Sequence, residues 1–370
     1  MWSNKIYVAT TSLGVYYTNN FTDPATQPVW TAINTGLGSL GCREFWLDPF
    51  EPDNRQYVLI GTTGGLYMRV NKGSWATILT LAEAAALVTA AGYPAGANTR
   101  MVSFCVDSTI QGRLWCFIAQ ASVTLYPRGY FALYTDNYGG SWTVTVAYAS
   151  HSTYDAYSIR AQGNTVFLTA NAFAGSYQVI FYSSNKGTSW SNKGLGSGGP
   201  DPHVGFNNLL PDRIYMTVDF TGWNGLAKIT NAGAQTNLWS SVRMARDDNM
   251  WFSLVDANHQ RYVIWGYLYV TNNEWSTKST AGLISPVPIS IAPQAGADED
   301  SMFVGLTLGT HIIGCLTNEA DTTATGIAGA NAGSSPYTDS IPNTCGGLAS
   351  MGIQAVPITT TIHSYKVAFA

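Results

Sequence analysis

The chain has 370 residues and a formal charge of −4, with only 11% charged residues against 46% hydrophobic and 13% aromatic ones. Its 18 Lys and Arg do not outnumber its 22 Asp and Glu, so it lacks the basic excess that neutralises nucleic-acid phosphates. The 12 Trp, 21 Tyr and 14 Phe exclude a disordered chain, and no run approaches the ~18 consecutive apolar residues of a membrane helix. We therefore expect a folded protein without nucleic-acid partners or a membrane span.

The first ten residues, Met1 to Thr10, read as a β-strand and contain no basic segment followed by an apolar one. The sequence as written thus shows no secretory leader, although its charge-poor, Thr/Asn/Gly-rich composition resembles that of exposed extracellular β-proteins. Two explanations stay open: a leader that was removed, or a protein that reaches the outside without export, as virion proteins do after lysis. We expect the second, because the chain starts with Met1.

Seven pairs of short β-branched and aromatic segments, separated by polar turns, follow one another along the chain and predict seven β-hairpins. The pairs are 5–10 with 14–18, 56–61 with 65–68, 113–118 with 130–134, 164–169 with 178–182, 213–218 with 225–229, 261–266 with 267–270, and 301–306 with 311–315. Between the second and third pairs, residues 79–91 are Ala-rich and lack Gly and Pro, which predicts a helix that ends at Gly92 and Pro94.

A motif of the form hydroxyl-x-Asn-x-Gly-x-Ser-Trp follows the third and fourth hairpins. Its residues are Thr135, Asn137, Gly139, Ser141 and Trp142 in the first copy, and Ser183, Asn185, Gly187, Ser189 and Trp190 in the second. Weaker copies end at Trp30, Trp75, Trp239 and Trp275, so successive tryptophans are 45, 67, 48, 49 and 36 residues apart. A four-stranded propeller blade takes about 40–50 residues, and the 67-residue interval contains the predicted helix.

These spacings predict an all-β fold in which residues 1–370 form a single seven-bladed β-propeller of four-stranded blades. Each short sheet has two apolar faces, and a ring of sheets buries them all. The N-terminal blade has three strands before Trp30, so we expect a C-terminal strand, such as 352–358, to close the ring. Two additions are expected, a helical insertion at 79–97 and a long Gly/Ala/Ser/Thr-rich loop at 321–350.

The boxes resemble the BNR or Asp-box repeat, S-x-D-x-G-x-T-W, of sialidases, xyloglucan-cleaving hydrolases, sortilin-type receptors and photosystem-assembly factors. The elements Leu47-Asp48-Pro49 and Gly64-Gly65-Leu66-Tyr67 strengthen the likeness to the xyloglucanase and sortilin branch. The resemblance implies that each box lies between the outer two strands of a blade, far from the axis, and is structural. Asn stands where the family prefers Asp, and Asn forms the same kind of Asx turn.

Recognition is expected where loops converge at one end of the axis, namely those that join second to third strands and those that join blades. The candidates there are aromatic or can hydrogen-bond: Tyr126, Arg128, Tyr154, Phe173, Tyr177 and Trp223. Such residues suit sugar rings or the centre of a protein interface. The alternative for each is packing against neighbouring loops.

A hydrolase would need two carboxylates about 5–10 Å apart on either side of the glycosidic bond. The loops offer Asp107, Asp155, Asp219 and Asp248, and a glycoside hydrolase would use a pair such as Asp155 and Asp219. The Arg-Ile-Pro motif of sialidases is missing, and a xyloglucanase resemblance implies two propellers, whereas this chain has length for one.

The histidines and cysteines predict neither a metal site nor a cofactor, because the five His are dispersed and the five Cys form no C-x-x-C pair. Cys105 and Cys116 flank a turn-like stretch, which leaves open a disulfide across a hairpin or buried thiols in adjacent strands.

The sequence therefore favours a non-enzymatic propeller displayed on an extracellular assembly, a virion surface or tail protein that binds a glycan or a protein at its axial rim. Partners in a virion or surface layer would follow from that role. Two alternatives remain: a glycoside hydrolase of the Asp-box type that acts on a polysaccharide, and an intracellular assembly factor.

Overall fold

The computed structural model describes the chain in segments. They are 6–10, 13–19, 29–52, 54–61, 64–93, 98–121, 128–151, 156–172, 177–197, 204–206, 210, 213–220, 223–230, 235–240, 249–252, 260–264, 267–271, 279–282, 288–293, 302–306, 313–316 and 365–369. The chain divides into two compact units, one formed by Met1–Phe45 with Asp247–Ala370 and the other by Trp46–Arg246.

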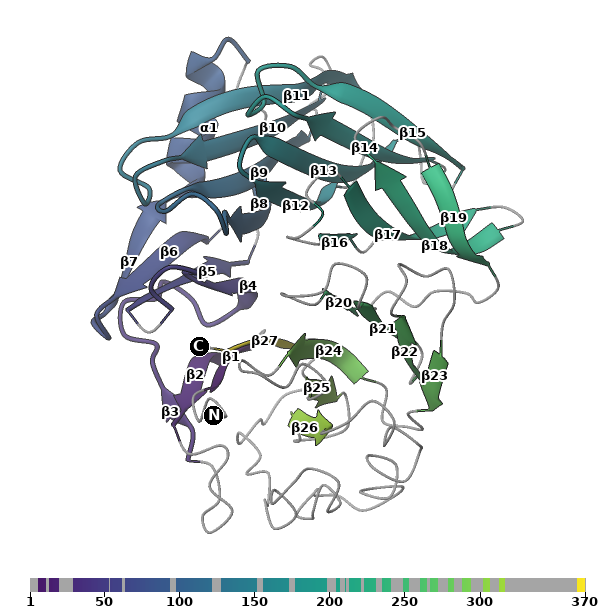
Figure 1. Ribbon diagram of the computed structural model, residues 1–370. Helices are drawn as coiled ribbons and strands as arrows, with labels where there is room; N and C mark the ends of the chain where they lie inside the picture. The colour runs from purple at the N-terminus through teal and green to yellow at the C-terminus, as the bar shows by residue number, and fades with distance from the viewer. Residues whose placement is uncertain are drawn as a thin grey trace. The chain divides into compact units, whose positions relative to one another are not determined.

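The Trp46–Arg246 unit contains four four-stranded sheets, in each of which every strand hydrogen-bonds to the next along the chain (Figure 1). Its strands are β4 (Cys42–Leu47, which begins just before the unit boundary), β5 (Arg55–Ile60), β6 (Gly65–Val70), β7 (Trp75–Leu79), β8 (Asn98–Val106), β9 (Leu114–Ala121), β10 (Arg128–Thr135), β11 (Thr143–His151), β12 (Ala156–Gln162), β13 (Thr165–Ala172), β14 (Tyr177–Ser183), β15 (Ser191–Ser197), β16 (Val204–Phe206), β17 (Arg213–Phe220), β18 (Trp223–Thr230) and β19 (Gln235–Ser240).

The other unit holds two four-stranded sheets, β27-β1-β2-β3 and β20-β21-β22-β23, and a sheet in which the described residues form three strands, β24-β25-β26. These strands are β1 (Ile6–Thr10), β2 (Gly14–Thr18), β3 (Thr31–Ala32), β20 (Asn249–Phe252), β21 (Gln260–Ile264), β22 (Tyr267–Thr271), β23 (Ser279–Gly282), β24 (Pro288–Pro293), β25 (Met302–Leu306), β26 (Ile313–Leu316) and β27 (Tyr365–Phe369).

All seven predicted hairpins are confirmed as antiparallel pairs. They are β1-β2, β5-β6, β9-β10, β13-β14, β17-β18, β21-β22 and β25-β26. The signal was strong because the second strand of a sheet can be buried on both faces, which selects a continuous apolar run. In β5, for example, every residue from Gln56 to Ile60 is buried.

A C-terminal strand completes the first sheet, but it is not the predicted one. β27 pairs with β1 in antiparallel register, Ile6 opposite Phe369 and Thr10 opposite Tyr365. The predicted segment 352–358 lies outside the described residues. Residues 365–369 alternate large apolar side chains with Lys366 and Ala368, a two-residue period that suits a strand, whereas 352–358 contains Gly352 and Pro357.

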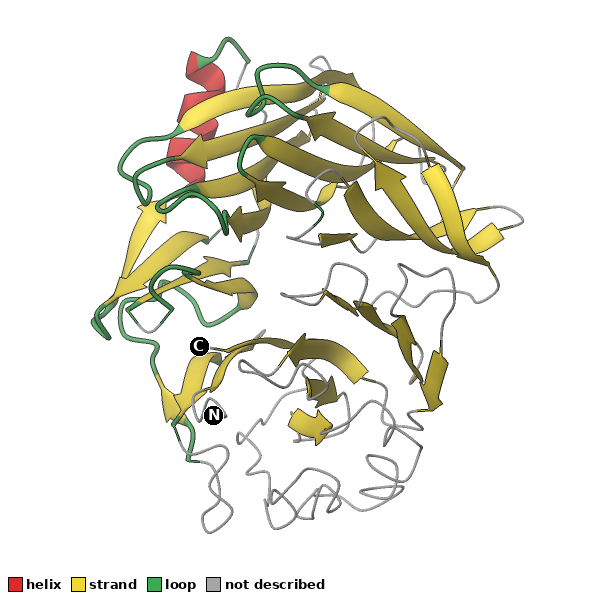
Figure 2. Cartoon of the chain, viewed as in Figure 1, coloured by secondary structure: helices red, strands yellow, loops and turns green. Residues whose placement is uncertain are grey.

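The predicted helix is confirmed as α1 (Leu81–Ala90), drawn in red in Figure 2. It begins with a capping box, in which the Glu83 backbone N–H donates to Thr80 Oγ1 at 3.1 Å and the Thr80 N–H donates to Glu83 Oε2 at 2.7 Å. These two bonds satisfy donors that have no partner within the helix. Ala84 and Val88 are buried in an apolar cluster that includes residues of β5 to β10, so this short helix is held by packing as well as by its cap.

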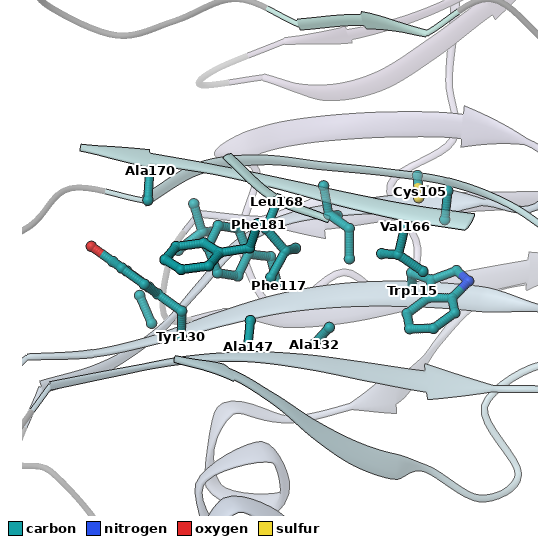
Figure 3. Packing of buried hydrophobic residues seen from close by; sticks show 14 of the residues in the cluster. Cys105, Trp115, Phe117, Tyr130, Ala132, Ala147, Val166, Leu168, Ala170 and Phe181 are labelled. Atoms are coloured by element: carbon teal, nitrogen blue, oxygen red, sulfur yellow. The ribbon is translucent and has the colours of Figure 1, made fainter. Parts of the chain in front are cut away.

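Two apolar clusters hold neighbouring sheets of the Trp46–Arg246 unit together. In Figure 3, Phe117 of β9 lies beside Leu168 of β13 and Phe181 of β14, and Trp115 of β9 lies beside Val166 of β13, between sheets β8–β11 and β12–β15. The second cluster joins β4–β7, α1 and the other face of β8–β11. Burying one such side chain contributes about 1.5–3 kcal/mol, so packing of sheet on sheet is the main source of stability.

The register settles how Cys105 and Cys116 are placed. Cys105 lies opposite Trp115 and Phe104 lies opposite Cys116, so the two cysteines are offset by one position and face opposite sides of the sheet. Each thiol is buried in a different apolar cluster. Of the two arrangements left open by the sequence, the structure therefore has buried cysteines in adjacent strands.

Among the described residues, no helix is long and apolar enough to cross a membrane.

Candidate functional site

The four-stranded sheets of the Trp46–Arg246 unit have two chemically different ends. In β8–β11 the β8–β9 turn and the β10–β11 loop lie at one end, because successive strands run antiparallel. The β10–β11 loop contains a box, so we term this the box end. The β9–β10 connection lies at the opposite end, termed the rim end.

Three of the predicted ligand-binding residues occupy the same position in three successive sheets. Arg128, Tyr177 and Trp223 are each the first residue of the third strand of their sheet, at the rim end. Asp219 lies in β17, opposite Asn224 and next to the same hairpin end as Trp223. The other predicted residues, Tyr126, Tyr154, Asp155 and Phe173, lie outside the described residues, as does Asp248.

Backbone irregularities accompany two of these positions. The pairing of β10 with β11 shifts register between Arg128 and Gly129, and the pairing of β14 with β15 shifts between Tyr177 and Val179. A β-bulge re-aims the strand and is frequent beside binding sites. At Gly129 an added Cβ would lie 2.2 Å from the Phe131 ring, so any other residue there requires that ring to move.

A buried amide near the same hairpin end was not anticipated from the sequence. Gln120 pairs with Thr99 on one side and Gly129 on the other, and its side chain is only 5% exposed. Its Nε2 has no acceptor among the residues that the structure describes, whereas the buried Gln56 donates to Pro52 O at 2.9 Å. A buried polar atom without a partner is uncommon, and no sequence pattern signals it.

Each box is a closed hydrogen-bonded loop between the outer two strands of its sheet, as the resemblance implied. In the first, the N–H of Gly139 donates to Thr135 Oγ1 at 3.1 Å and the N–H of Ser141 donates to Asn137 Oδ1 at 2.9 Å. In the second, the Gly187 and Ser189 N–H groups donate to the corresponding Ser183 and Asn185 oxygens at 2.8 and 2.9 Å. Every polar box side chain is used in binding its own loop, which leaves it a structural role.

The boxes also dock on the preceding sheet. An added Cβ on Gly139 would lie 2.8 Å from Ile78 Cβ of β7, and one on Gly187 would lie 2.5 Å from Thr145 Oγ1 of β11. Trp142 Nε1 donates to the carbonyl of Ile78 at 3.1 Å. The boxes therefore join blade to blade at the box end.

A carboxylate links the two boxes. Asp136, in the first box loop, accepts from Arg113 Nε at 2.6 Å and forms an ion pair with Lys186 of the second box loop. Partial burial raises the pKa of Asp136, but the hydrogen bonds and charges of Arg113 and Lys186 outweigh burial and hold it below its ordinary value. The link is structural and lies at the box end.

Asp107, a candidate rim carboxylate, is in fact at the box end, in the β8–β9 turn. It is fully buried, and its oxygens accept from the Thr109 N–H at 2.8 Å, the Ile110 N–H at 3.1 Å and the Gly163 N–H at 2.7 Å. The expectation was wrong because Asp107 follows β8 directly, where an Asx turn requires a carboxylate for local backbone reasons. It cannot act as an acid or base in a rim site.

Asp48 repeats this arrangement one sheet earlier. It accepts from the Phe50 N–H at 2.9 Å, from Arg55 Nη1 at 3.2 Å and from the Tyr57 hydroxyl at 3.1 Å. Burial, reinforced by the charge of Asp48, raises the pKa of Tyr57 far above its ordinary value, so this phenol stays protonated. The Leu-Asp-Pro element of the sequence thus places a buried carboxylate whose hydrogen bonds hold the turn after β4.

Strand β12, the first strand of its sheet, carries a positively charged residue that the sequence did not single out. The Arg160 guanidinium of β12 lies over the indole ring of Trp46 of β4, 5.3 Å from its centroid, and Nη1 donates to the Ile159 carbonyl at 2.7 Å. The sequence offered no signal for this pair, because the two residues belong to sheets separated by a third.

No group of three or more His, Cys, Asp or Glu that could hold a metal ion occurs in the part of the chain that the structure describes.

Known structures with similar sheets identify the architecture. A GH74 xyloglucanase from Xanthomonas campestris superposes with a TM-score of 0.57 at 13% identity, over 87% of this chain and 51% of that chain. The chain thus spans about half of the xyloglucanase. The chain has a β-propeller fold.

Two further solved structures are similar over most of their length. A protein from Lactobacillus plantarum gives a TM-score of 0.52 at 13% identity, over 86% of this chain and 92% of that chain. A functionally unknown protein from Desulfotomaculum acetoxidans gives 0.51 at 12% identity, over 85% and 92%. No family model matches the chain, and no curated protein does. These likenesses concern the fold alone.

Proposed function

We propose that this protein is a non-enzymatic, carbohydrate-binding β-propeller whose ligand lies at the rim end. The observation that carries the proposal is the repetition of Arg128, Tyr177 and Trp223 at one position in three successive sheets. Aromatic rings and a guanidinium together match a sugar, which presents C–H faces for stacking and hydroxyls for hydrogen bonds. The register shifts beside Arg128 and Tyr177 support the proposal, since they alter the strands at these residues.

The finer architecture belongs to the same proposal. The sheets are the seven blades of one ring built on Asp-box repeats, and β27 closes it by pairing with β1. In a closed ring, the rim ends of all blades converge on one axis. Arg128, Tyr177 and Trp223 can contact one ligand only if their rim ends converge in this way. A cryo-electron microscopy or crystal structure with seven blades is the expected result, and an open array of sheets would contradict it.

Glycan-array binding followed by titration calorimetry tests the function. We expect Trp223→Ala to weaken binding of the best ligand at least tenfold, while Trp239→Ala, a box tryptophan position, leaves affinity unchanged under conditions where both variants are folded. A parent protein that binds no glycan at all would overturn the proposal, and specific capture of a protein ligand through the same rim residues would transfer the site to a protein partner.

Hydrolysis is the competing outcome of the same experiment. An enzyme would use Asp219 with Asp155, and parent protein incubated with a polysaccharide panel would release reducing ends. Loss of that release in both Asp155→Ala and Asp219→Ala would replace the binding proposal with a hydrolase. We expect no turnover in the parent protein.

We also propose that the propeller is displayed on an extracellular assembly such as a virion surface or tail. Support comes from composition, since 11% charged residues with 13% aromatic residues suit an exposed surface that recognises neutral or weakly charged ligands. Mass spectrometry of purified particles and of the secreted fraction tests it. Absence from both, with the protein retained inside cells on a protein partner, would favour an assembly factor.

A further inference from the structure

Arg160 differs in its partners from Arg55 and Arg113 of the same unit. Arg113 binds Asp136, and Arg55 binds Asp48 at 3.2 Å and Glu51 at 3.4 Å. Within the described part of the chain, Arg160 contacts only the Trp46 ring and the carbonyl of Ile159, and it has no carboxylate partner. A guanidinium has five N–H donors, so the described residues leave most of its hydrogen-bonding capacity unused.

The position of this guanidinium follows from the sheet order. Trp46 lies in β4 and Arg160 in β12, and each is the first strand of a sheet on either side of β8–β11. Trp46 packs against both apolar clusters, which cover opposite faces of β8–β11, so its ring lies across the edge of that sheet at β8. Arg160 therefore meets Trp46 where three first strands adjoin, the edge that faces the axis in a propeller.

The pair is already arranged to receive an anion. Stacking on an aromatic ring is electrostatically favourable for a guanidinium and restrains it. The bond from Nη1 to Ile159 fixes its orientation further. A restrained guanidinium loses little entropy when it binds a carboxylate through two parallel hydrogen bonds.

We propose that Arg160, held by Trp46, binds an anionic group of the ligand, and that the ligand is an acidic glycan carrying carboxylate or sulfate groups. The inference rests on the proposed carbohydrate-binding function and adds a charge requirement and a residue of the first strands to it. Arg160 is the fifth residue of β12, which begins at the rim end with Ala156, so the ligand extends about 13 Å along this strand from the rim end. At that depth Arg160 selects for the acidic group.

Titration calorimetry with three oligosaccharide sets of equal length tests this: neutral, uronate-containing and sulfated. We expect the parent protein to bind one acidic set at least tenfold more tightly than the neutral set. Arg160→Gln removes this preference and leaves neutral affinity within twofold. Arg160→Lys keeps the charge but not the paired donors, so it retains only part of the preference. Whichever acidic set binds more tightly identifies the anion.

Lys72→Gln is the matched control, because it removes one positive charge from an exposed residue of the same unit. We expect it to keep the preference for acidic ligands. Thermal unfolding of every variant tests whether it is folded. If Arg160→Gln is unfolded, the preference of Arg160→Lys for acidic over neutral ligands tests the proposal instead.

The outcomes separate the two claims. A folded Arg160 variant that keeps the full acidic preference, or a parent that prefers neutral glycans, overturns the role of Arg160 while carbohydrate binding stands. A parent that binds none of the three sets overturns carbohydrate binding and, with it, this inference.

Discussion

The two boxes form the same loop but attach it to the preceding sheet differently. In both, an Asn side-chain oxygen accepts the N–H of the Ser four residues later, at 2.9 Å in each case. Their tryptophans diverge, since Trp142 Nε1 donates to the carbonyl of Ile78, whereas Trp190 Nε1 is buried and has no acceptor within the described segments. The box residues themselves therefore determine the loop, while its attachment depends on which groups the neighbouring sheet presents.

The glycines give the largest expected effect on this comparison. Gly139 has φ +94° and Gly187 has φ +76°, both in the left-handed region, and each lies too close to the preceding sheet for a Cβ. Alanine at either position combines backbone strain with overpacking and should lower the free energy of unfolding by about 2–4 kcal/mol. Urea unfolding measures the loss.

Gly92→Ala is the control for that prediction. Gly92 also has a positive φ of +93°, but nothing lies within 4 Å of an added Cβ. It should therefore show backbone strain alone, about 1–2 kcal/mol. Equal losses at Gly92 and Gly187 would mean that the box glycines do not dock against the neighbouring sheet.

The Asn residues test whether the loop depends on its own hydrogen bonds. Asn185→Ala removes the acceptor for the Ser189 N–H and the donor to Ser189 Oγ, and should cost about 1–3 kcal/mol, with Asn137→Ala similar. Asn→Asp should stay within about 0.5 kcal/mol of the parent, because the Ser hydroxyl can turn and donate to the carboxylate. Denaturation midpoints at pH 7 check both. A large loss for Asp would contradict the shared geometry with the Asp-box resemblance.

The tryptophans test the difference between the boxes directly. Phe in place of Trp142 or Trp190 removes a similar ring volume, but only Trp142→Phe breaks a hydrogen bond, while Trp190→Phe removes an unpaired buried N–H. We expect Trp142→Phe to be less stable than Trp190→Phe by about 1–2 kcal/mol. The reverse order in chemical unfolding would refute the assigned partners.

The smallest effect concerns the ion pair between the boxes. The pKa of Asp136 is lowered in the folded protein, so its carboxylate contributes stability at neutral pH, and this contribution is lost as pH falls through the folded-state pKa. Because Asp136 is 45% exposed, Asp136→Asn should cost less than about 1 kcal/mol at pH 7. Unfolding measured at pH 7 and pH 3 should show that the stability lost in Asp136→Asn becomes smaller as the pH falls. An equal loss at both pH values would exclude an electrostatic origin of the effect.

Local signals made much of the fold predictable. The second and third strands are continuous apolar runs, and the Asn and Gly positions of the boxes have geometry that few other residues allow. The helix was found from its Ala-rich composition, although its first residue is Leu81 because Leu79 belongs to β7. The C-terminal strand that pairs with β1 was misplaced because any alternating C-terminal segment could pair with β1, and pairing between the two ends of the chain leaves no local trace in the sequence.

The site was less predictable than the fold. Strand order fixes the end of the sheet at which Arg128 and Tyr177 lie, and counting hairpins is enough to find that end. Their role in binding a ligand stays a prediction. Asp107 was assigned to the wrong end because a carboxylate that follows a strand can either hold a turn through hydrogen bonds or act in catalysis. Only its burial in the structure distinguishes these two roles. Arg160 was missed because its partner Trp46 lies in another sheet, more than a hundred positions away in the sequence.

In this protein the repeated box residues build the propeller, and residues outside the repeat recognise the ligand. Measuring both stability and glycan affinity in Asn185→Ala and Trp223→Ala tests this division most directly. The account predicts that Asn185→Ala lowers the free energy of unfolding by about 1–3 kcal/mol and keeps its affinity within twofold, whereas Trp223→Ala keeps its stability and loses affinity at least tenfold. Loss of binding in a stable Asn185→Ala protein, with full binding in Trp223→Ala, would contradict it.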